Sequence, residues 1–265
     1  MVPVSGVRTE AAVVELRRVS AEVDRALHAF VDRQPLSDFY DLVRYHLGWG
    51  APNGAPAIRS RAVLCVLACR ACGGTTRTAL PMAVAIALLH SFASNQEDLE
   101  RHREVSRGRP TVGSVWGTPQ AMNAGDGMHA LAKMALLEAR DRIPAQAILR
   151  LEEALDECSL SACEILHQEL LGGSTNATEL AVAKSSVLFA CAGWSGCYLA
   201  GTDEALSERM RRFGELLGAA SADGSQAQDC HSQALQALEL TGLTAAKLGP
   251  LRALAEYVMR PGALT

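Results

Sequence analysis

The sequence has few lysines, few aromatic residues and no surplus of positive charge. Of its 265 residues only three are lysines (Lys133, Lys184 and Lys247), and 5% are aromatic. The formal net charge is −4 and the isoelectric point is about 6.0. A protein that binds duplex DNA or RNA normally carries a basic patch that neutralises phosphates. We therefore expect no nucleic-acid partner.

Long apolar runs and a secretion signal are also lacking. The longest apolar run, residues 79–89, contains a proline and has 11 residues, whereas a membrane-spanning helix needs about 20. The first 18 residues contain acidic side chains and no long apolar stretch, unlike a signal peptide. We expect a cytoplasmic protein that is not an integral membrane protein.

Common catalytic patterns are missing as well. The sequence contains no GxSxG, Walker A, GxGxxG or HExxH pattern, which removes the usual starting points for hydrolase, nucleotide-binding and zinc-protease functions. The eight cysteines lie mostly in apolar, alanine-rich runs. A free thiol in such a run packs as a small hydrophobic side chain, so we expect core positions rather than a zinc ribbon.

What the sequence does contain is helical periodicity. Apolar residues make up 49% of the chain, and in residues 9–33 they recur with the spacing of one helix face. The predicted helices cover residues 9–33, 36–48, 59–71, 79–104, 118–139, 143–170, 177–200, 203–221, 225–240 and 246–260. No long run alternates as a strand does. We expect one all-α domain over residues 1–265, with 1–50 as N-terminal helices and the most apolar helices buried in a bundle.

Four segments, in the same order along the chain, resemble the trans-isoprenyl diphosphate synthases. Residues 58–74 resemble the stretch that begins GGKRxRP, and residues 79–126 resemble the helix, first aspartate-rich motif, RRGxPT loop and AGD of that family. Residues 182–220 resemble the lysine-containing helix and the YGxxLGxAFQ run, and residues 251–260 the C-terminal helix. The resemblance implies an isoprenoid-synthase-type helical bundle that pairs into dimers.

The family's first DDxxD motif corresponds here to Glu97, Asp98, Leu99, Glu100 and Arg101. In the family these carboxylates hold Mg²⁺ ions that bridge to diphosphate oxygens, and the resemblance makes Glu97, Asp98 and Glu100 candidate metal ligands. Arg101, at the fifth position, would repel a cation and can instead pair with Glu97 one helical turn away. The alternative interpretation is a solvated, ion-paired helix end.

The second aspartate-rich motif is weaker still. Its positions correspond to residues 225–229, where Asp229 alone keeps a carboxylate, and the nearby Asp223 is a further acidic candidate. The resemblance makes Asp229 a possible Mg²⁺ ligand, whereas an ordinary polar helix residue is the alternative. The family's GKxxGxD segment has no counterpart after it.

Five basic residues match positions that bind diphosphate in the family. They are Arg59, Arg61, Arg107, Arg109 and Lys184. Guanidinium groups suit phosphate oxygens because they stay charged and donate in a fork, although the same residues could be ordinary surface arginines. The family's isopentenyl-binding lysine is replaced by Ile58. His90 matches a histidine buried in a helix, and we do not expect it to act as a base.

The resemblance implies a role in isoprenoid biosynthesis and leaves three possibilities open. The first is a catalytically impaired small subunit that modulates an active prenyl diphosphate synthase, because several metal ligands are replaced. The second is a divergent Mg²⁺-dependent prenyltransferase or terpene-cyclase-like enzyme that uses an allylic prenyl diphosphate with another acceptor. The third is a protein that binds a prenyl chain without chemistry. The partners implied are a prenyl diphosphate or prenyl chain, and a second copy or an active homologue.

Overall fold

The computed structural model describes residues 4–34, 37–49, 58–171, 177–222 and 225–260. Within these ranges the regular secondary structure is helical apart from one short hairpin. The elements are α1 (Val4–Asp32), α2 (Asp38–His46), α3 (Ser60–Ala71), α4 (Thr76–Glu100), β1 (Val105–Ser106), β2 (Arg109–Pro110), α5 (Val112–Trp116), α6 (Thr118–Leu137), α7 (Ala145–Leu170), α8 (Ala177–Leu199), α9 (Glu204–Ser221), α10 (Ala227–Glu239) and α11 (Ala245–Val258). The expected all-α bundle is confirmed.

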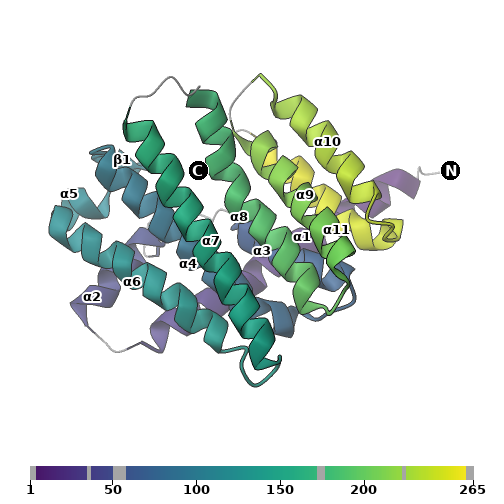
Figure 1. Cartoon of the computed structure of the whole chain (residues 1–265), viewed down its shortest axis with the longest axis horizontal. Coiled ribbons are helices and arrows are strands. Elements are labelled where there is room, and N and C mark those ends of the chain that lie inside the picture. The colour runs from purple at the N-terminus through teal and green to yellow at the C-terminus, as the bar shows by residue number, and fades with distance from the viewer. Residues whose placement is uncertain (1–3, 35–36, 50–57, 172–176, 223–224, 261–265) are drawn as a thin grey trace.

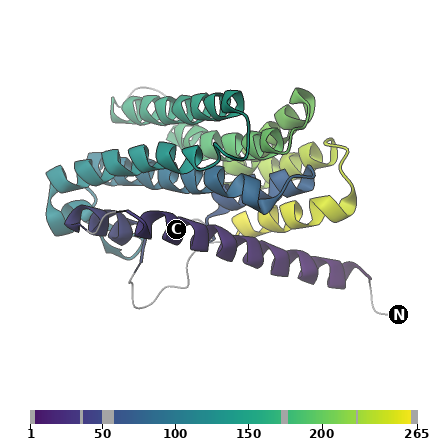
Figure 2. The ribbon, with the colours of Figure 1, turned by 90° about the horizontal axis from the view of Figure 1, so that it is seen from below.

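Helices α7, α8, α9 and α10 run side by side across the molecule, each in contact with the next (Figure 1). Seen from below, α1 runs along one face of the molecule and α7 along the opposite face, with α4 between them (Figure 2). The central helices are buried on most sides, as their sequences predict. Large side chains with less than 2% of their surface exposed include Leu64 on α3, Met82 and Ile86 on α4, Phe189 on α8 and Phe213 on α9.

Two of these helices are apolar enough to be compared with membrane spans. By length and composition, two helical segments could cross a membrane: Thr76–Glu100 and Thr178–Leu199. The most apolar stretch of each is, however, mostly buried inside the protein (72% and 67%). Buried core helices of water-soluble domains can be equally long and apolar. The expectation that the chain does not span a membrane therefore stays a prediction.

The structure departs from the predicted helices after Glu100. The helix expected over residues 79–104 ends at Glu100, and the chain then forms the β1–β2 hairpin and the short helix α5. The register pairs Val105 with Pro110, and Ser106 with Arg109. The two intervening residues, Arg107 and Gly108, have φ values of 52° and 72°. Two positive φ values in succession are the geometry of a tight hairpin turn, and glycine at the second position favours it.

The cysteines occupy the predicted core positions in most cases. Five of the eight are buried: Cys65, Cys69, Cys158, Cys191 and Cys197. Among the described residues no group of three histidine, cysteine or acidic side chains is placed to hold a metal ion.

Glycines allow α8 and α9 to pack with their backbones nearly in contact. A Cβ atom added at Gly214 would collide with the carbonyl oxygen of Phe189, and one added at Gly218 would lie 2.5 Å from the Cα of Ser186. Because backbone cannot move aside as a flexible side chain can, any larger residue must push the two helices apart. This packing holds the wall that α8 forms in the cavity described below.

We expect Gly214→Ala to lower the free energy of unfolding by about 1–3 kcal/mol, the usual cost of overpacking. Gly249→Ala on α11 is the matched control, since the nearest atom to an added Cβ there is 3.9 Å away, and alanine favours helix over glycine. Urea denaturation measures both. If Gly214→Ala had the same urea midpoint as the native chain, the close backbone packing of α8 and α9 would be contradicted.

Candidate functional site

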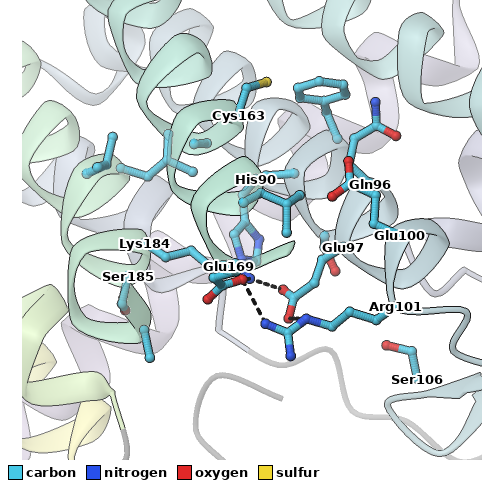
Figure 3. A pocket seen from close by; sticks show the side chains of 18 of the residues that line it. His90, Gln96, Glu97, Glu100, Arg101, Ser106, Cys163, Glu169, Lys184 and Ser185 are labelled. Carbon is cyan, nitrogen blue, oxygen red and sulfur yellow. Dashed lines mark hydrogen bonds and ion pairs between the residues drawn. The ribbon is translucent and has the colours of Figure 1, made fainter. Parts of the chain in front are cut away.

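A cavity of about 800 Å³ opens between the C-terminal ends of α4 and α7, the N-terminal half of α8 and the β1–β2 hairpin. Apolar side chains such as Leu166 and Leu188 form part of its wall, and charged side chains form the rest. Figure 3 shows the charged side chains of α4, α7 and α8 converging at one side of this space. An elongated apolar ligand with a charged end is the kind of molecule that such a lining suits.

Glu97 is the centre of an ion-pair network at the charged side. Its Oε2 atom lies 2.7 Å from Nζ of Lys184. Its Oε1 atom accepts a hydrogen bond from Arg103 at 2.8 Å and lies 3.3 Å from Nε of Arg101. The pairing of Glu97 with Arg101, expected from their spacing, is confirmed. Both carboxylate oxygens of Glu97, the first candidate metal ligand, are thus paired with basic side chains.

Glu169 closes the network from α7. Arg101 donates to Oε2 of Glu169 at 2.7 Å, and Nζ of Lys184 lies 3.6 Å from the same oxygen. The four side chains therefore form a ring in which carboxylates and cations alternate, drawn with dashed lines in Figure 3. The ring joins three helices that are distant in sequence.

The surroundings shift the pKa values of the two glutamates on α4 in opposite directions. Burial alone would raise the pKa of Glu97, but the hydrogen bond and charge of Lys184, with Arg103 and Arg101, lower it below the ordinary value. The pKa of Glu100 is raised, mainly by burial and also by the charge of Glu169. Near neutral pH, Glu97 is an ionised partner of these cations.

Arg61 and Arg107 bring two more cations to the cavity wall. Burial and the charge of Arg107 lower the pKa of Arg61 to about 10, so it is still charged at pH 7. Its guanidinium lies over the ring of Phe189, 4.7 Å from the centroid, and its Nε atom is buried without a hydrogen-bond partner among the described residues. Arg107 donates to the hydroxyl of Ser94 at 3.1 Å.

Arg59 and Arg109 do not reach the cavity lining. Arg59 donates to Asp24 at 2.9 Å and to the carbonyl of Leu47 at 3.2 Å. Arg109 donates to the carbonyl oxygens of Tyr45 and His46, the latter at 2.7 Å. These arginines fasten α2 and the chain after it to the bundle. Of the five predicted diphosphate-binding residues, the structure brings together Arg61, Arg107 and Lys184.

His90, on α4, borders the cavity. Burial, followed by the charges of Arg61 and Arg107, holds its pKa well below the ordinary value. Burial and the same arginine-rich surroundings lower the pKa of His46 to about 3. Both imidazoles are therefore neutral at pH 7 and add no charge to this region.

The remaining candidate metal ligands do not join Glu97. Asp98 is buried, faces a separate small pocket beside Tyr45 and lies 3.4 Å from Arg103. Asp229 is exposed in the first turn of α10 and is not among the residues that line the cavity. Asp223 lies outside the described residues. Glu100 lines the cavity.

The described residues do not fit a magnesium site at this position. Mg²⁺ needs oxygen ligands in near-octahedral geometry, whereas the oxygens of Glu97 are paired with Lys184, Arg101 and Arg103. The charged lining consists of five cationic side chains (Arg61, Arg101, Arg103, Arg107 and Lys184) and three carboxylates (Glu97, Glu100 and Glu169). The excess of two positive charges suits direct binding of an anion.

Sequence patterns could not have identified Glu169 as a site residue. It lies 68 residues from Arg101, and no motif surrounds it. Arg103 carried a weak signal, since it belongs to a run of mixed charge that was predicted to form ion pairs.

Comparisons with known proteins agree with this architecture. The sequence profile of the family described as polyprenyl synthetase matches residues 53–222. A geranylgeranyl diphosphate synthase of Mycobacterium tuberculosis is 34% identical over 77% of this chain. The small subunit of a heterodimeric geranylgeranyl pyrophosphate synthase from Arabidopsis thaliana is 28% identical over 74% of it. The chain spans 61% of the length of each of these relatives.

Solved structures show the same fold. The crystal structure of a polyprenyl synthetase from Streptomyces coelicolor A3(2) superimposes with a TM-score of 0.78 at 22% sequence identity, covering 95% of this chain and all of that one. At this identity the likeness concerns the fold alone.

The ion pairs of Glu97 predict how stability depends on pH. Because the folded-state pKa is lowered, the stability contributed by Glu97 is complete above the ordinary glutamate pKa of about 4.3 and is lost as the pH falls through the folded value. We expect Glu97→Gln to lower the free energy of unfolding by about 1–2 kcal/mol at pH 7, and the difference from the native chain to shrink below pH 4.

The measurement is urea denaturation at a series of pH values from 7 to 3. Glu104→Gln serves as the control because Glu104 is exposed and its side chain forms no ion pair with any residue that the structure describes. A Glu97→Gln difference that stays constant across this range would contradict the assignment.

Proposed function

The chain belongs to the polyprenyl synthetase family, and from this we propose that it is a catalytically impaired partner subunit of an active prenyl diphosphate synthase. The main observation behind the proposal is that Glu97 is already ion-paired. Both of its oxygens are held by cations, at the position where the family's first metal-binding motif begins. A carboxylate in that state is a poor ligand for a further cation.

Three other features support impaired chain elongation. Asp229, the one acid left in the second motif, is exposed on α10 away from the cavity lining. Ile58 packs against the hydrophobic core where the family has its isopentenyl-binding lysine. The neighbouring Arg59 forms an ion pair with Asp24. Loss of a single electrostatic element commonly costs an enzyme orders of magnitude in rate.

A surface suited to a partner subunit lies on α5, α6 and α7. The large apolar side chains of these helices that are at least 40% exposed in the isolated chain include Val115, Trp116, Met122, Met134, Leu137, Leu149 and Leu160. Helices α6 and α7 lie next to each other in Figure 1. Several exposed large apolar side chains on neighbouring helices are typical of protein interfaces. We assign it to a homologous subunit, because the small subunit from Arabidopsis thaliana is one of the relatives.

The cavity itself fits a prenyl diphosphate. The family binds such molecules, and this lining combines the cations Arg61, Arg107 and Lys184 with an apolar wall. With an excess of positive charge, the diphosphate can be bound by side chains directly. Mg²⁺ dependence, which the resemblance implies, has no ligand cluster among the described residues.

We expect the chain alone to condense no isopentenyl diphosphate with an allylic diphosphate at any Mg²⁺ concentration. Co-expressed with a homologue that keeps both DDxxD motifs, it should change the product chain length. The double variant Leu149→Asp/Leu160→Asp should abolish that effect by placing charges in the interface. Chromatography of extracted products measures both.

Leu240→Asp is the control for this experiment, since Leu240 is equally exposed but lies after α10. It should leave the co-expression effect unchanged. Metal-dependent diphosphate release by the chain alone would instead favour the divergent-enzyme alternative. No change in product under any combination would refute the partner role.

Binding of the ligand makes a separate prediction. We expect farnesyl diphosphate to bind in the presence of EDTA, and Arg61→Met to weaken binding about tenfold or more, because a charge-assisted hydrogen bond contributes about 1.5–3 kcal/mol. Isothermal titration calorimetry measures the dissociation constants. Arg17→Met is the control, since Arg17 is exposed on α1.

Farnesol distinguishes the alternatives in the same experiment. Weaker binding of farnesol than of its diphosphate supports recognition of the diphosphate. Equal affinities would indicate a chain-binding protein, and loss of all binding in EDTA would contradict direct recognition by the cations.

A further inference from the structure

Two thiols meet where α3 ends against the end of α8. The Sγ atoms of Cys72 and Cys197 are 2.7 Å apart, only about 0.7 Å more than the length of a disulfide bond. Cys72 caps the C-terminus of α3, and Cys197 is buried near the C-terminus of α8. Neither residue lines the cavity. The pair is therefore separate from the site described above.

The glycines after Cys72 bring these two helix ends together. Gly73 has a φ of 96°, a left-handed conformation that glycine adopts without strain. A Cβ atom added at Gly74 would lie 2.5 Å from Sγ of Cys69 and 3.1 Å from Cβ of Ala200. The turn thus packs directly on the end of α8. Gly196 continues this close approach, since a Cβ there would meet the α3 backbone at Cys65 and Cys69.

The two thiols differ in access and in acidity. Cys72 is partly exposed. Its contact with the Cys197 thiol lowers its pKa, and the charge of Lys247 lowers it further, although burial acts in the opposite direction. Cys197 is buried, and its contact with Cys72 and its burial raise its pKa. Since the thiolate is the reactive form, Cys72 is the thiol that an oxidant reaches first.

We propose that Cys72 and Cys197 form a reversible disulfide that fastens the end of α3 to the end of α8 when the protein meets a peroxide. In the first step the Cys72 thiolate attacks one oxygen of hydrogen peroxide, giving a sulfenic acid while the other oxygen leaves as hydroxide and becomes water. In the second step the Cys197 sulfur attacks the sulfenic sulfur and water leaves. Two thiols lose two electrons and two protons to one peroxide, and a dithiol reductant reverses the reaction.

Other thiols in the chain provide internal comparisons. Cys69 and Cys72 form a CxxC pair, but Cys69 donates to the carbonyl of Thr75 at 3.7 Å, and burial raises its pKa to about 11. Cys158 and Cys191 also interact, and both are buried. Cys69 is held by the Thr75 carbonyl, and neither Cys158 nor Cys191 is accessible, so neither pairing should form a disulfide.

Tryptic peptides distinguish these pairings. Cleavage after Arg70 separates Cys69 from Cys72, leaving Cys72 in residues 71–77, and Cys197 lies in residues 185–209 together with Cys191. After hydrogen peroxide treatment, alkylation of remaining thiols and digestion, we expect peptides 71–77 and 185–209 to be joined, lighter by two hydrogen atoms than their sum. Dithiothreitol should release them.

Variants assign the bond and measure its effect. Cys197→Ser should abolish the joined species, whereas Cys191→Ser should retain it. The oxidised full-length protein should melt several degrees higher than the reduced protein, because the bond restricts the unfolded chain, and Cys72→Ser should show no such difference. Cys163→Ser, which removes an exposed thiol of α7, is the control and should behave as the native chain does.

Several outcomes would overturn the proposal. Complete alkylation of Cys72 and Cys197 after peroxide treatment is one. A bond from residues 71–77 to the peptide of Cys69, or persistence of the joined species in Cys197→Ser, is another. Oxidation of Cys72 only to sulfinic acid, with Cys197 still a thiol, would equally exclude the disulfide. None of these outcomes depends on the proposed function, because no ligand or partner enters the experiment.

Discussion

The shared carboxylate of Glu97 is the interaction on which the candidate site depends. It joins Lys184 on α8 to Arg101 and Arg103 at the end of α4, and Glu169 on α7 completes the ring. Removing one partner of a partly buried ion pair destabilises the protein, because the remaining charge is then desolvated and unpaired. The cations therefore keep Glu97 ionised and in place, and Glu97 keeps the cations at the mouth of the cavity.

The fold depends mainly on apolar packing, and only to a small extent on this charge arrangement. The bundle is held by apolar side chains of the central helices, including Met82, Ile86, Phe189 and Phe213, and by backbone contact at Gly214. Hydrophobic burial is roughly proportional to apolar area and indifferent to which charges line a surface cavity. A chain can thus keep the architecture of its family while the acidic residues of the cavity are replaced. This separation of core and cavity is what makes an impaired partner subunit physically reasonable.

Much of the fold could be predicted because the helical period of 3.6 residues is written locally in the sequence. The apolar stripe of α1 and the apolar character of α4 and α8 depend on residues only a few positions apart. The pairing of Glu97 with Arg101 was predictable for the same reason. The hairpin at Arg107 and Gly108 was not, because the charged run before it continues the helical pattern to residue 104, whereas α4 ends at Glu100 and His102 follows with a positive φ.

By itself the sequence determined the helices, the buried character of the central ones and, through its motifs, the family. Only the tertiary structure decided what the charged residues do. Arg59 and Arg109 occupy the expected positions along the chain, yet they bind Asp24 and backbone carbonyls, whereas Glu169, without any motif, joins the cavity. The reason is that helix formation follows from nearby residues, whereas the partner of a long charged side chain is whichever group the packing of distant helices brings within about 3 Å.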